Sequence, residues 1–252
     1  MKYEKENKNN NIIGENTNFL KKENLKSHTE RLKSVDKVVI IRETGLKITE
    51  DALLLAKFIK NIFMGKSGNV NWTFIKNKTI LEIGAGQGII SILLSEIQNI
   101  SKIYAVEVQK KIYEYLVDNI KKNCLEDKIL TLNEDIKNIN GKYDYIFSNP
   151  PYKKINSGKL PEDESIKISK YEVGLTLEEL FFNIKRLLKN YGEFFVVVPN
   201  YRLNDSFSYI YKNGLKILNL EINEYKKVKL VIIHGKKGGE VNSGIEITYE
   251  KR

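Results

Sequence analysis

Leu81-Glu82-Ile83-Gly84-Ala85-Gly86-Gln87-Gly88 joins the end of an apolar segment to three glycines at alternate positions. The apolar residues Thr79–Ile83 have the length of a short strand, and Ile89–Ile97 has the apolar character of a buried helix. Glycines in the turn between them remove the Cβ atoms that would keep a ligand away from the backbone. This strand, turn and helix predict an α/β fold that binds a ligand at the carboxyl end of the strand.

The spacing of the glycines separates two classes of ligand. Dinucleotide-binding enzymes carry the pattern G-x-G-x-x-G, with a pyrophosphate at the N-terminus of the helix. Here the spacing is G-x-G-x-G, and the acidic Glu82 precedes the first glycine, Gly84. Because a carboxylate at this place suits an ammonium group better than a phosphate, the pattern disfavours a dehydrogenase.

Strands and helices alternate over the rest of the chain. Further strands are predicted at Lys102–Val106, Ile129–Leu132, Tyr143–Phe147, Glu193–Val198, Lys216–Glu224 and Val228–His234. Helices are predicted at Lys110–Asn123, Thr176–Lys189 and Leu203–Asn213, and Thr176 with Glu179 fits a capping box. Such alternation predicts a mostly parallel sheet covered by helices on both faces.

Two acidic residues follow the next strands. Glu107 ends the second strand, and a carboxylate there accepts hydrogen bonds from both hydroxyls of a ribose. Sites for nicotinamide dinucleotides use the same arrangement, so Glu107 alone does not choose the ligand. Asp135 follows the third strand, where it would bind a ligand or cap a local helix.

Ser148-Asn149-Pro150-Pro151-Tyr152 follows the strand Tyr143–Phe147. Two successive prolines hold the backbone extended and remove its donors. The Asn149 side-chain oxygen and the Pro150 carbonyl then face one site as two acceptors, which match the two hydrogens of a planar NH₂ group. Tyr152 offers a flat ring on which a planar substrate stacks. These residues indicate chemistry on an exocyclic amine.

Together these motifs resemble the class I S-adenosylmethionine (SAM) amino-methyltransferases of the NPPY type. The resemblance implies a Rossmann-like seven-stranded sheet in the order 3-2-1-4-5-7-6, with strand 7 antiparallel. It implies SAM as the methyl donor and no metal. The cofactor would be bound by Glu82, Gly84, Gly86, Gly88, Glu107, Asp135 and Asn149, and catalysis would use Asn149, Pro150, Pro151 and Tyr152.

Three further segments resemble one branch, the bacterial tRNA1(Val) adenine-37-N6 methyltransferases. Gly45–Ala56 is similar to the lead-in helix of that branch, with its "DAxLLA" pattern. Ile168–Glu172 is similar to its "ARHE" segment, although Tyr171 stands where His is usual. Lys237–Gly239, before a final strand at Ile245–Tyr249, is similar to its C-terminal end. The resemblance implies methylation of adenine N6 in tRNA, with adenine 37 of tRNA1(Val) as the expected target.

Several alternatives remain open. A related branch methylates the glutamine amide of release factors but carries a larger helical N-terminal domain. The ribosomal-RNA guanine enzymes have a duplicated domain, and the DNA adenine enzymes have a target-recognition domain. From a different class, the chain would be a catalytically dead RNA-binding module, which the complete Asn149–Tyr152 motif disfavours.

The charge of the chain fits a polyanionic partner. Lys plus Arg is 42 and Asp plus Glu is 32, so the net charge is 42 − 32 = +10. Codon bias toward Lys, Asn and Ile would explain part of this excess. Lys153, Lys154 and Lys170 follow the Asn149–Tyr152 motif and are the expected contacts to RNA phosphates.

The domain organisation and location follow from composition. Residues 1–35 are predicted to form a polar, flexible leader, residues 36–252 one methyltransferase domain, and Val38–Ile41 its first short strand. One cysteine and two histidines exclude an intrachain disulfide and a Cys-rich zinc site and leave little for a catalytic triad. We see neither a membrane-spanning run nor a signal peptide, and we expect a cytoplasmic monomer with no membrane partner.

Overall fold

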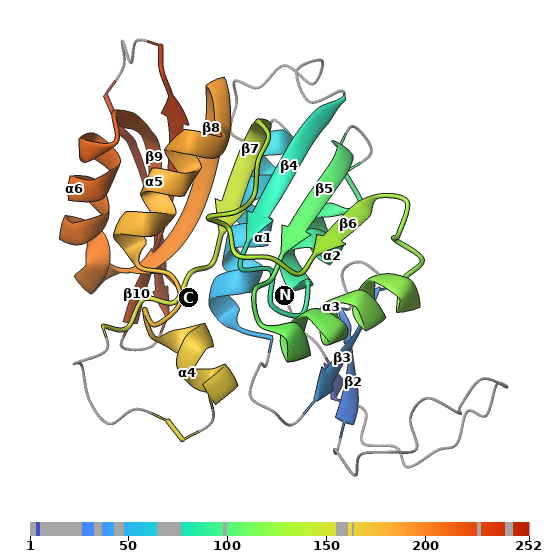
Figure 1. The fold of residues 1–252 in the computed structure, drawn as a ribbon. Coiled ribbons are helices and arrows are strands. Elements are labelled where there is room, and N and C mark those ends of the chain that lie inside the picture. The colour runs from blue at the N-terminus through green and yellow to red at the C-terminus, as the bar shows by residue number, and fades with distance from the viewer. Residues whose placement is uncertain are drawn as a thin grey trace, which may run out of the picture.

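The computed structural model describes residues 4–5, 27–32, 37–42, 48–64, 77–97, 100–154, 161–162, 164–225, 228–239 and 244–251. Within these ranges, eight strands form one twisted sheet in the order β11-β9-β10-β8-β7-β4-β5-β6 (Figure 1). Their bounds are β4 (Lys78–Ile83), β5 (Ile100–Val106), β6 (Ile129–Leu132), β7 (Tyr143–Ser148), β8 (Leu188–Pro199), β9 (Leu215–Tyr225), β10 (Val228–Lys237) and β11 (Glu246–Lys251).

This topology confirms the predicted fold class. From β6 to β9 the strands follow the order 3-2-1-4-5-7-6, and β10 runs antiparallel to both β8 and β9. The difference lies at the edge, where β11 pairs in parallel with β9 and makes eight described strands rather than seven. The resemblance places a final strand at Ile245–Tyr249, and β11 is that strand added to the sheet.

Helices cover both faces of the sheet. Their bounds are α1 (Glu50–Phe63), α2 (Ile89–Leu94), α3 (Lys110–Lys122), α4 (Glu164–Lys170), α5 (Leu177–Leu187) and α6 (Leu203–Lys212), with a short 3-10 helix η3 (Asn200–Arg202). Within β8, Phe195 and Val197 face the core formed with α1, α2 and α3. Phe194, Val196 and Val198 face the opposite core with α5 and α6. Alternate side chains point to opposite faces of a strand, so a continuous apolar run is buried on both sides.

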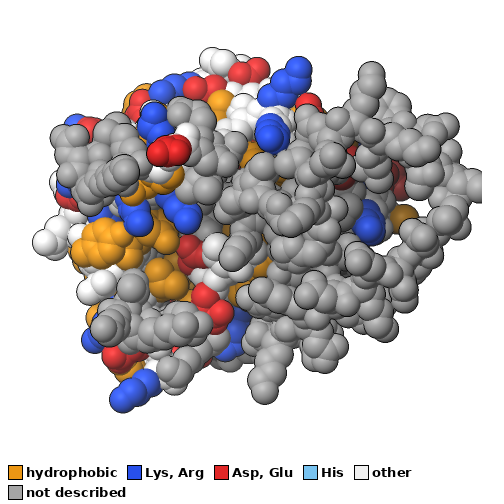
Figure 2. Space-filling model, turned by 90° about the horizontal axis from the view of Figure 1, so that it is seen from below, with side chains coloured by type: hydrophobic (Ala, Val, Ile, Leu, Met, Phe, Trp, Pro, Cys, Tyr) orange, Lys and Arg blue, Asp and Glu red, His pale blue; other side chains and the backbone are white. Residues whose placement is uncertain are grey.

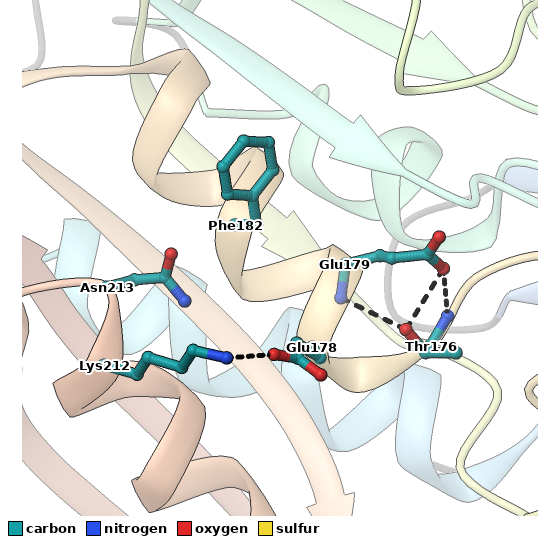
Figure 3. A pocket seen from close by; sticks show the side chains of 6 residues that line it. All are labelled: Thr176, Glu178, Glu179, Phe182, Lys212 and Asn213. Atoms are coloured by element: carbon teal, nitrogen blue, oxygen red, sulfur yellow. Dashed lines mark hydrogen bonds and ion pairs between the residues drawn. The ribbon is translucent and has the colours of Figure 1, made fainter.

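The start of α5 shows how local sequence sets a helix boundary. The Thr176 hydroxyl accepts a hydrogen bond from the Glu179 amide at 3.2 Å, and the Glu179 carboxylate accepts one from the Thr176 amide at 3.0 Å (Figure 3). Both N-terminal amides are thereby satisfied. The predicted capping box is confirmed.

Among the described helices, none is long and apolar enough to cross a membrane.

A smaller antiparallel sheet lies near the N-terminus. It contains β1 (Glu4–Lys5), β2 (Ser27–Leu32) and β3 (Lys37–Arg42), and β3 contacts α3 and α2. The predicted strand Val38–Ile41 lies within β3. Two of the three strands fall inside residues 1–35, which the sequence predicts to be a flexible leader. The pairing of β2 with β3 therefore crosses the predicted boundary, because a polar strand carries little apolar signal.

Gly88 fixes the turn between β4 and α2. Its φ is +85°, and a Cβ built on it would lie 2.6 Å from the Cδ1 atom of the buried Leu116 on α3. Gly88→Ala is therefore expected to lower the free energy of unfolding by about 2 kcal/mol, measured by urea denaturation. Gly84→Ala is the matched control, because Gly84 also has a positive φ but has nothing within 4 Å of its Cβ position. Equal losses in both variants would contradict the packing argument.

Candidate active site

A cavity of about 1100 Å³ opens at the carboxyl ends of β4, β5 and β7. Parallel strands that end at the same edge of a sheet bring the residues after them together there. Of the predicted site residues, those that line the cavity are Glu82, Gly84, Gly86, Glu107, Asp135, Asn149, Pro150, Pro151, Tyr152, Lys153 and Lys170. Gly88 and Lys154 are not among its lining residues. Figure 2 views the molecule from the side to which these strands point, and shows hydrophobic side chains beside both basic and acidic ones.

The glycine-rich loop is tied to the end of β5. The Ala85 amide donates to the Val106 carbonyl at 2.9 Å, and the Gly86 amide donates to the Glu107 carboxylate at 3.0 Å. Gly84 and Gly86 have φ values of +71° and +56°, which other residues rarely adopt. The open space beside Gly84 leaves its backbone accessible to a ligand. Gly88, in contrast, lies against Leu116, so its contact is with the core.

Glu82 is a buried carboxylate at the end of β4. It accepts hydrogen bonds from both the amide and the hydroxyl of Ser91, the amide at 3.2 Å. Burial raises the pKa of the Glu82 carboxyl to about 8, because removal from water disfavours the charged form. A carboxyl with this pKa is mostly protonated at neutral pH, and a cation bound beside it would favour its charged form.

Glu107 bridges two backbone segments. Its carboxylate accepts from the Gly86 amide at 3.0 Å and from the Gln109 amide at 2.9 Å, one bond at each oxygen. Burial raises the pKa of Glu107, and the two amides act in the opposite direction. Each carboxylate oxygen has a further lone pair, so the pair of oxygens remains able to accept bonds from a diol.

Asp135 caps a turn and also lines the cavity. Its carboxylate accepts a hydrogen bond from the Lys137 amide at 2.9 Å, which caps the turn after β6. The same residue lines the cavity. Among the described residues, no three His, Cys, Asp or Glu side chains are grouped so as to hold a metal ion.

The Asn149–Tyr152 segment follows β7 and carries an unsatisfied acceptor. Asn149 Oδ1 is buried and, among the described residues, has no hydrogen-bond partner. Buried polar atoms are otherwise paired in folded proteins, so an orphan beside a cavity points to a ligand donor. The Tyr152 hydroxyl donates to the Asp51 carboxylate at 3.3 Å, and burial raises the pKa of this hydroxyl well above its usual range. The phenol is therefore neutral.

Two residues that contact this segment are not predicted from the sequence. Asp51, on the first turn of α1, lines the cavity and is buried. Arg202, in η3, is buried and donates to the Tyr152 carbonyl. The lead-in pattern marks Asp51 only as the start of a helix. Arg202 carries no signal, because it reaches Tyr152 from 50 residues away in the sequence.

The three predicted RNA-contacting lysines lie on or beside the rim of the cavity. Lys153 and Lys170 line it. The Lys153 ammonium lies 5.5 Å from the centre of the Tyr171 ring, and the Lys154 ammonium forms a 3.0 Å ion pair with Asp205. Both side chains therefore have partners within the chain, and contact with a phosphate would compete with these interactions.

The sheet order, the glycine-rich loop after β4 and the motif after β7 are features of the class I SAM-dependent methyltransferases. Comparisons with known proteins confirm this resemblance. Residues 40–156 match the family described as the TRM5/TYW2 methyltransferase domain.

Several relatives are tRNA1(Val) (adenine(37)-N6)-methyltransferases. That of Dyadobacter fermentans is 30% identical over 122 residues, which is 48% of this chain and 50% of the relative. That of Bacteroides fragilis is 32% identical over 134 residues, or 51% of this chain and 55% of the relative. A putative protein N5-glutamine methyltransferase of Methanocaldococcus jannaschii is 27% identical over 223 residues, or 84% and 95%. Thus the chain spans about half the length of the first two.

Solved structures share the fold. The tRNA m1G37 methyltransferase of M. jannaschii superposes with a TM-score of 0.58 at 15% identity, covering 86% of this chain and 56% of that one. TYW2 of M. jannaschii in complex with AdoMet, which is SAM, gives 0.54 at 18% identity, covering 85% and 86%. The predicted class I methyltransferase fold is thereby confirmed.

Proposed function

We propose that this chain binds SAM in the cavity and transfers its methyl group to the exocyclic N6 of an adenine in tRNA, with adenine 37 of tRNA1(Val) as the target. The observation that carries the proposal is the buried, unpartnered Asn149 Oδ1 at the cavity. An acceptor that lacks a partner among the described residues is ready for the N–H of a substrate amine.

The polar groups around the cavity fit SAM. Glu82 would bind the ammonium group of its amino-acid end, Glu107 the ribose hydroxyls and Asp135 the adenine amine. Gly84 and Gly86 let the ligand approach the backbone. When bound, SAM supplies an electrophilic methyl group on a sulfonium.

The residues after β7 would prepare the acceptor amine. An amine conjugated to a ring is a poor nucleophile because its lone pair is delocalised. Asn149 Oδ1 and the Pro150 carbonyl would each accept one of its hydrogens, which turns the lone pair toward the methyl donor. Tyr152 would stack on the base. The rate gain would come from positioning and electrostatics, with no general base needed before attack.

The relatives favour tRNA as the substrate. The curated adenine-N6 enzymes and the tRNA m1G37 enzyme that shares the fold are both named for position 37 of a tRNA. A base in an anticodon loop is already outside a duplex, so little free energy is needed to bring it into a cavity. That property suits a compact enzyme.

A second candidate substrate is the side-chain amide of a glutamine in a protein. The putative N5-glutamine methyltransferase aligns over 95% of its own length, far more than the first two adenine enzymes do. An amide NH₂ presents the same two hydrogens to Asn149 Oδ1 and the Pro150 carbonyl. Only a planar base, however, would use the full face of Tyr152.

Mass spectrometry of the products tests the proposal. The purified chain is incubated with SAM and unmodified tRNA1(Val), and the RNA is digested with a ribonuclease to oligonucleotides that are sequenced by tandem mass spectrometry. N6-methyladenosine at position 37 is the expected product. N5-methylglutamine in a release factor offered under the same conditions, without any methylated RNA, would favour the second candidate. N1-methylguanosine alone would overturn the adenine assignment.

Replacement of Lys153 and Lys154 with Gln is expected to weaken tRNA binding without changing SAM affinity. Gln is used because Glu at position 154 would repel Asp205. The slope of log affinity against log salt is expected to fall by about 1.4, about 0.7 for each phosphate that is no longer neutralised by a lysine. Filter binding at several salt concentrations measures it. Lys121→Gln/Lys122→Gln, an exposed pair on α3, is the matched control. Unchanged affinity at low salt would refute the role of Lys153 and Lys154.

A further inference from the structure

Tyr152 is held at both of its ends. Its hydroxyl donates to Asp51 Oδ2 at 3.3 Å, from the first turn of α1. Its carbonyl accepts from the guanidinium of Arg202, in η3 after β8. Asp51 is 8% exposed and Arg202 is 3% exposed, so both partners of Tyr152 are buried. Elements far apart in the sequence thus meet at one residue.

Behind Tyr152, Arg202 is itself fixed by two carboxylates. Its Nη2 donates to Glu172 at 2.9 Å, and its Nε donates to Asp205 at 3.0 Å. Glu172 also accepts from the Leu177 amide at 3.0 Å, at the start of α5. The planar guanidinium uses its separate donors at once, which a lysine cannot do. The Tyr152 carbonyl is therefore attached to α5 and α6 through charge-assisted bonds.

The backbone after Tyr152 is hydrogen-bonded to the segment that contains Glu172. The Lys153 amide donates to the Lys170 carbonyl at 3.0 Å, and the Glu172 amide donates to the Lys153 carbonyl at 2.9 Å. This short parallel pairing ties the chain after the motif to the segment that resembles "ARHE". Of that segment, Glu172 is the residue that supports Arg202.

Asp51 holds a buried carboxylate in the first turn of α1. Within the described part of the chain, no ion pair involves it, and its Oδ1 accepts a hydrogen bond from the Ala52 amide at 3.1 Å. The N-terminus of a helix favours a carboxylate at this place. Its one interaction with another residue's side chain in that part of the chain is the bond from Tyr152.

We propose that Asp51 and Arg202 are positioning residues that hold the Tyr152 ring in a single orientation, so that the substrate base stacks beside Asn149. This rests on the proposed function, since a planar base is what the ring would bind. Loss of either contact would let Tyr152 move from this position and weaken substrate binding.

A double-mutant cycle on the full chain tests the Asp51 contact. Asp51→Ala and Tyr152→Phe are each expected to raise the KM for tRNA about fivefold, the effect of one lost hydrogen bond. The double variant is expected to be no worse than either single one, because both remove the same bond. Asp51→Asn keeps an oxygen acceptor and is expected to stay within about twofold of the wild type. Fivefold effects that multiply to about 25-fold would overturn the proposal.

Glu50→Ala is the matched control, since it removes the neighbouring carboxylate from the same first turn. Its effect on KM, whatever its size, is expected to multiply with that of Tyr152→Phe. Each of the two variants is combined with Tyr152→Phe. If Glu50→Ala and Asp51→Ala deviate equally from multiplicative behaviour, the effect belongs to the helix end in general, and the specific contact is overturned.

A second readout needs no substrate. Fluorotyrosine at position 152 is expected to give one sharp ¹⁹F resonance in the wild type. In Asp51→Ala and in Arg202→Lys the resonance is expected to shift toward that of free fluorotyrosine. An unchanged resonance in folded variants would overturn the positioning role. If the resonance shifts as expected but no RNA is methylated, the positioning role stands and the proposed function fails.

Discussion

Asn149→Ala is expected to lower the rate of methyl transfer about 10²- to 10³-fold, the loss typical of removing one preorganised polar contact to a reacting group. Asn149 Oδ1 has no partner among the described residues, so truncation breaks no described hydrogen bond of that oxygen. The fold and SAM affinity are therefore expected to persist. Single-turnover transfer from tritiated SAM measures the rate, and calorimetry measures the affinity.

A conservative variant and a control variant are compared with Asn149→Ala. Asn149→Asp keeps an oxygen acceptor and is expected to retain more activity than Asn149→Ala. Asn140→Ala, an identical change at an exposed position outside the cavity, is expected to leave the rate unchanged. Turnover at the wild-type rate in Asn149→Ala would refute the acceptor role.

SAM affinity is expected to rise with pH up to about pH 8 and to fall above it, where the α-ammonium of SAM loses its own proton. Glu82→Gln is expected to abolish the rise while weakening binding. The pKa of Glu82 is raised to about 8 by burial, so the free site is protonated at neutral pH. Binding an ammonium favours the carboxylate and so releases a proton. Below pH 8 the affinity is then expected to change up to about tenfold per pH unit. Calorimetry in two buffers of different ionisation enthalpy counts the released proton.

The Glu82 carboxyl is expected to make the stability of the free protein fall as pH rises, whereas SAM affinity rises. A carboxyl whose pKa is raised on folding stabilises the protein fully below its unfolded pKa, and this stability is lost as pH rises toward 8. Glu82→Gln is therefore expected to melt at a higher temperature than the wild type at pH 8 in the absence of SAM. Glu114→Gln, an exposed change on α3, is the control. A pH-independent SAM affinity between pH 6 and 8 would contradict the role of Glu82.

Sequence patterns of short range predicted most of the fold. The two-sided apolar run of β8 and the stripe of α5 each depend on neighbours along the chain, and both elements form where they are predicted. Their boundary differs, because α5 ends at Leu187 and β8 begins at Leu188, so Leu188 and Lys189 belong to the strand and not to the predicted helix. The polar strands β1 and β2 have no such pattern. They are defined by backbone pairing, to which side-chain periodicity gives little clue.

The site was predictable where a strand delivers its residues. Glu82 lies at the end of β4, and Glu107 and Asn149 directly follow the parallel strands β5 and β7, so topology alone brings them together. Contacts between segments that are distant in the sequence could not be predicted from it. Asp51 meets Tyr152 across 101 positions, and only the three-dimensional packing of α1 reveals it.

Gly88 has a wider consequence for how this chain tolerates change. The hydrogen of Gly88 occupies the place next to a methyl group of Leu116, and the loop that opens the cavity begins four residues earlier at Gly84. The packing of α3 against this turn and the position of the loop at the cavity therefore depend on each other. Variation that enlarges residue 116, although buried away from any ligand, would be selected against in the same way as variation in the loop itself.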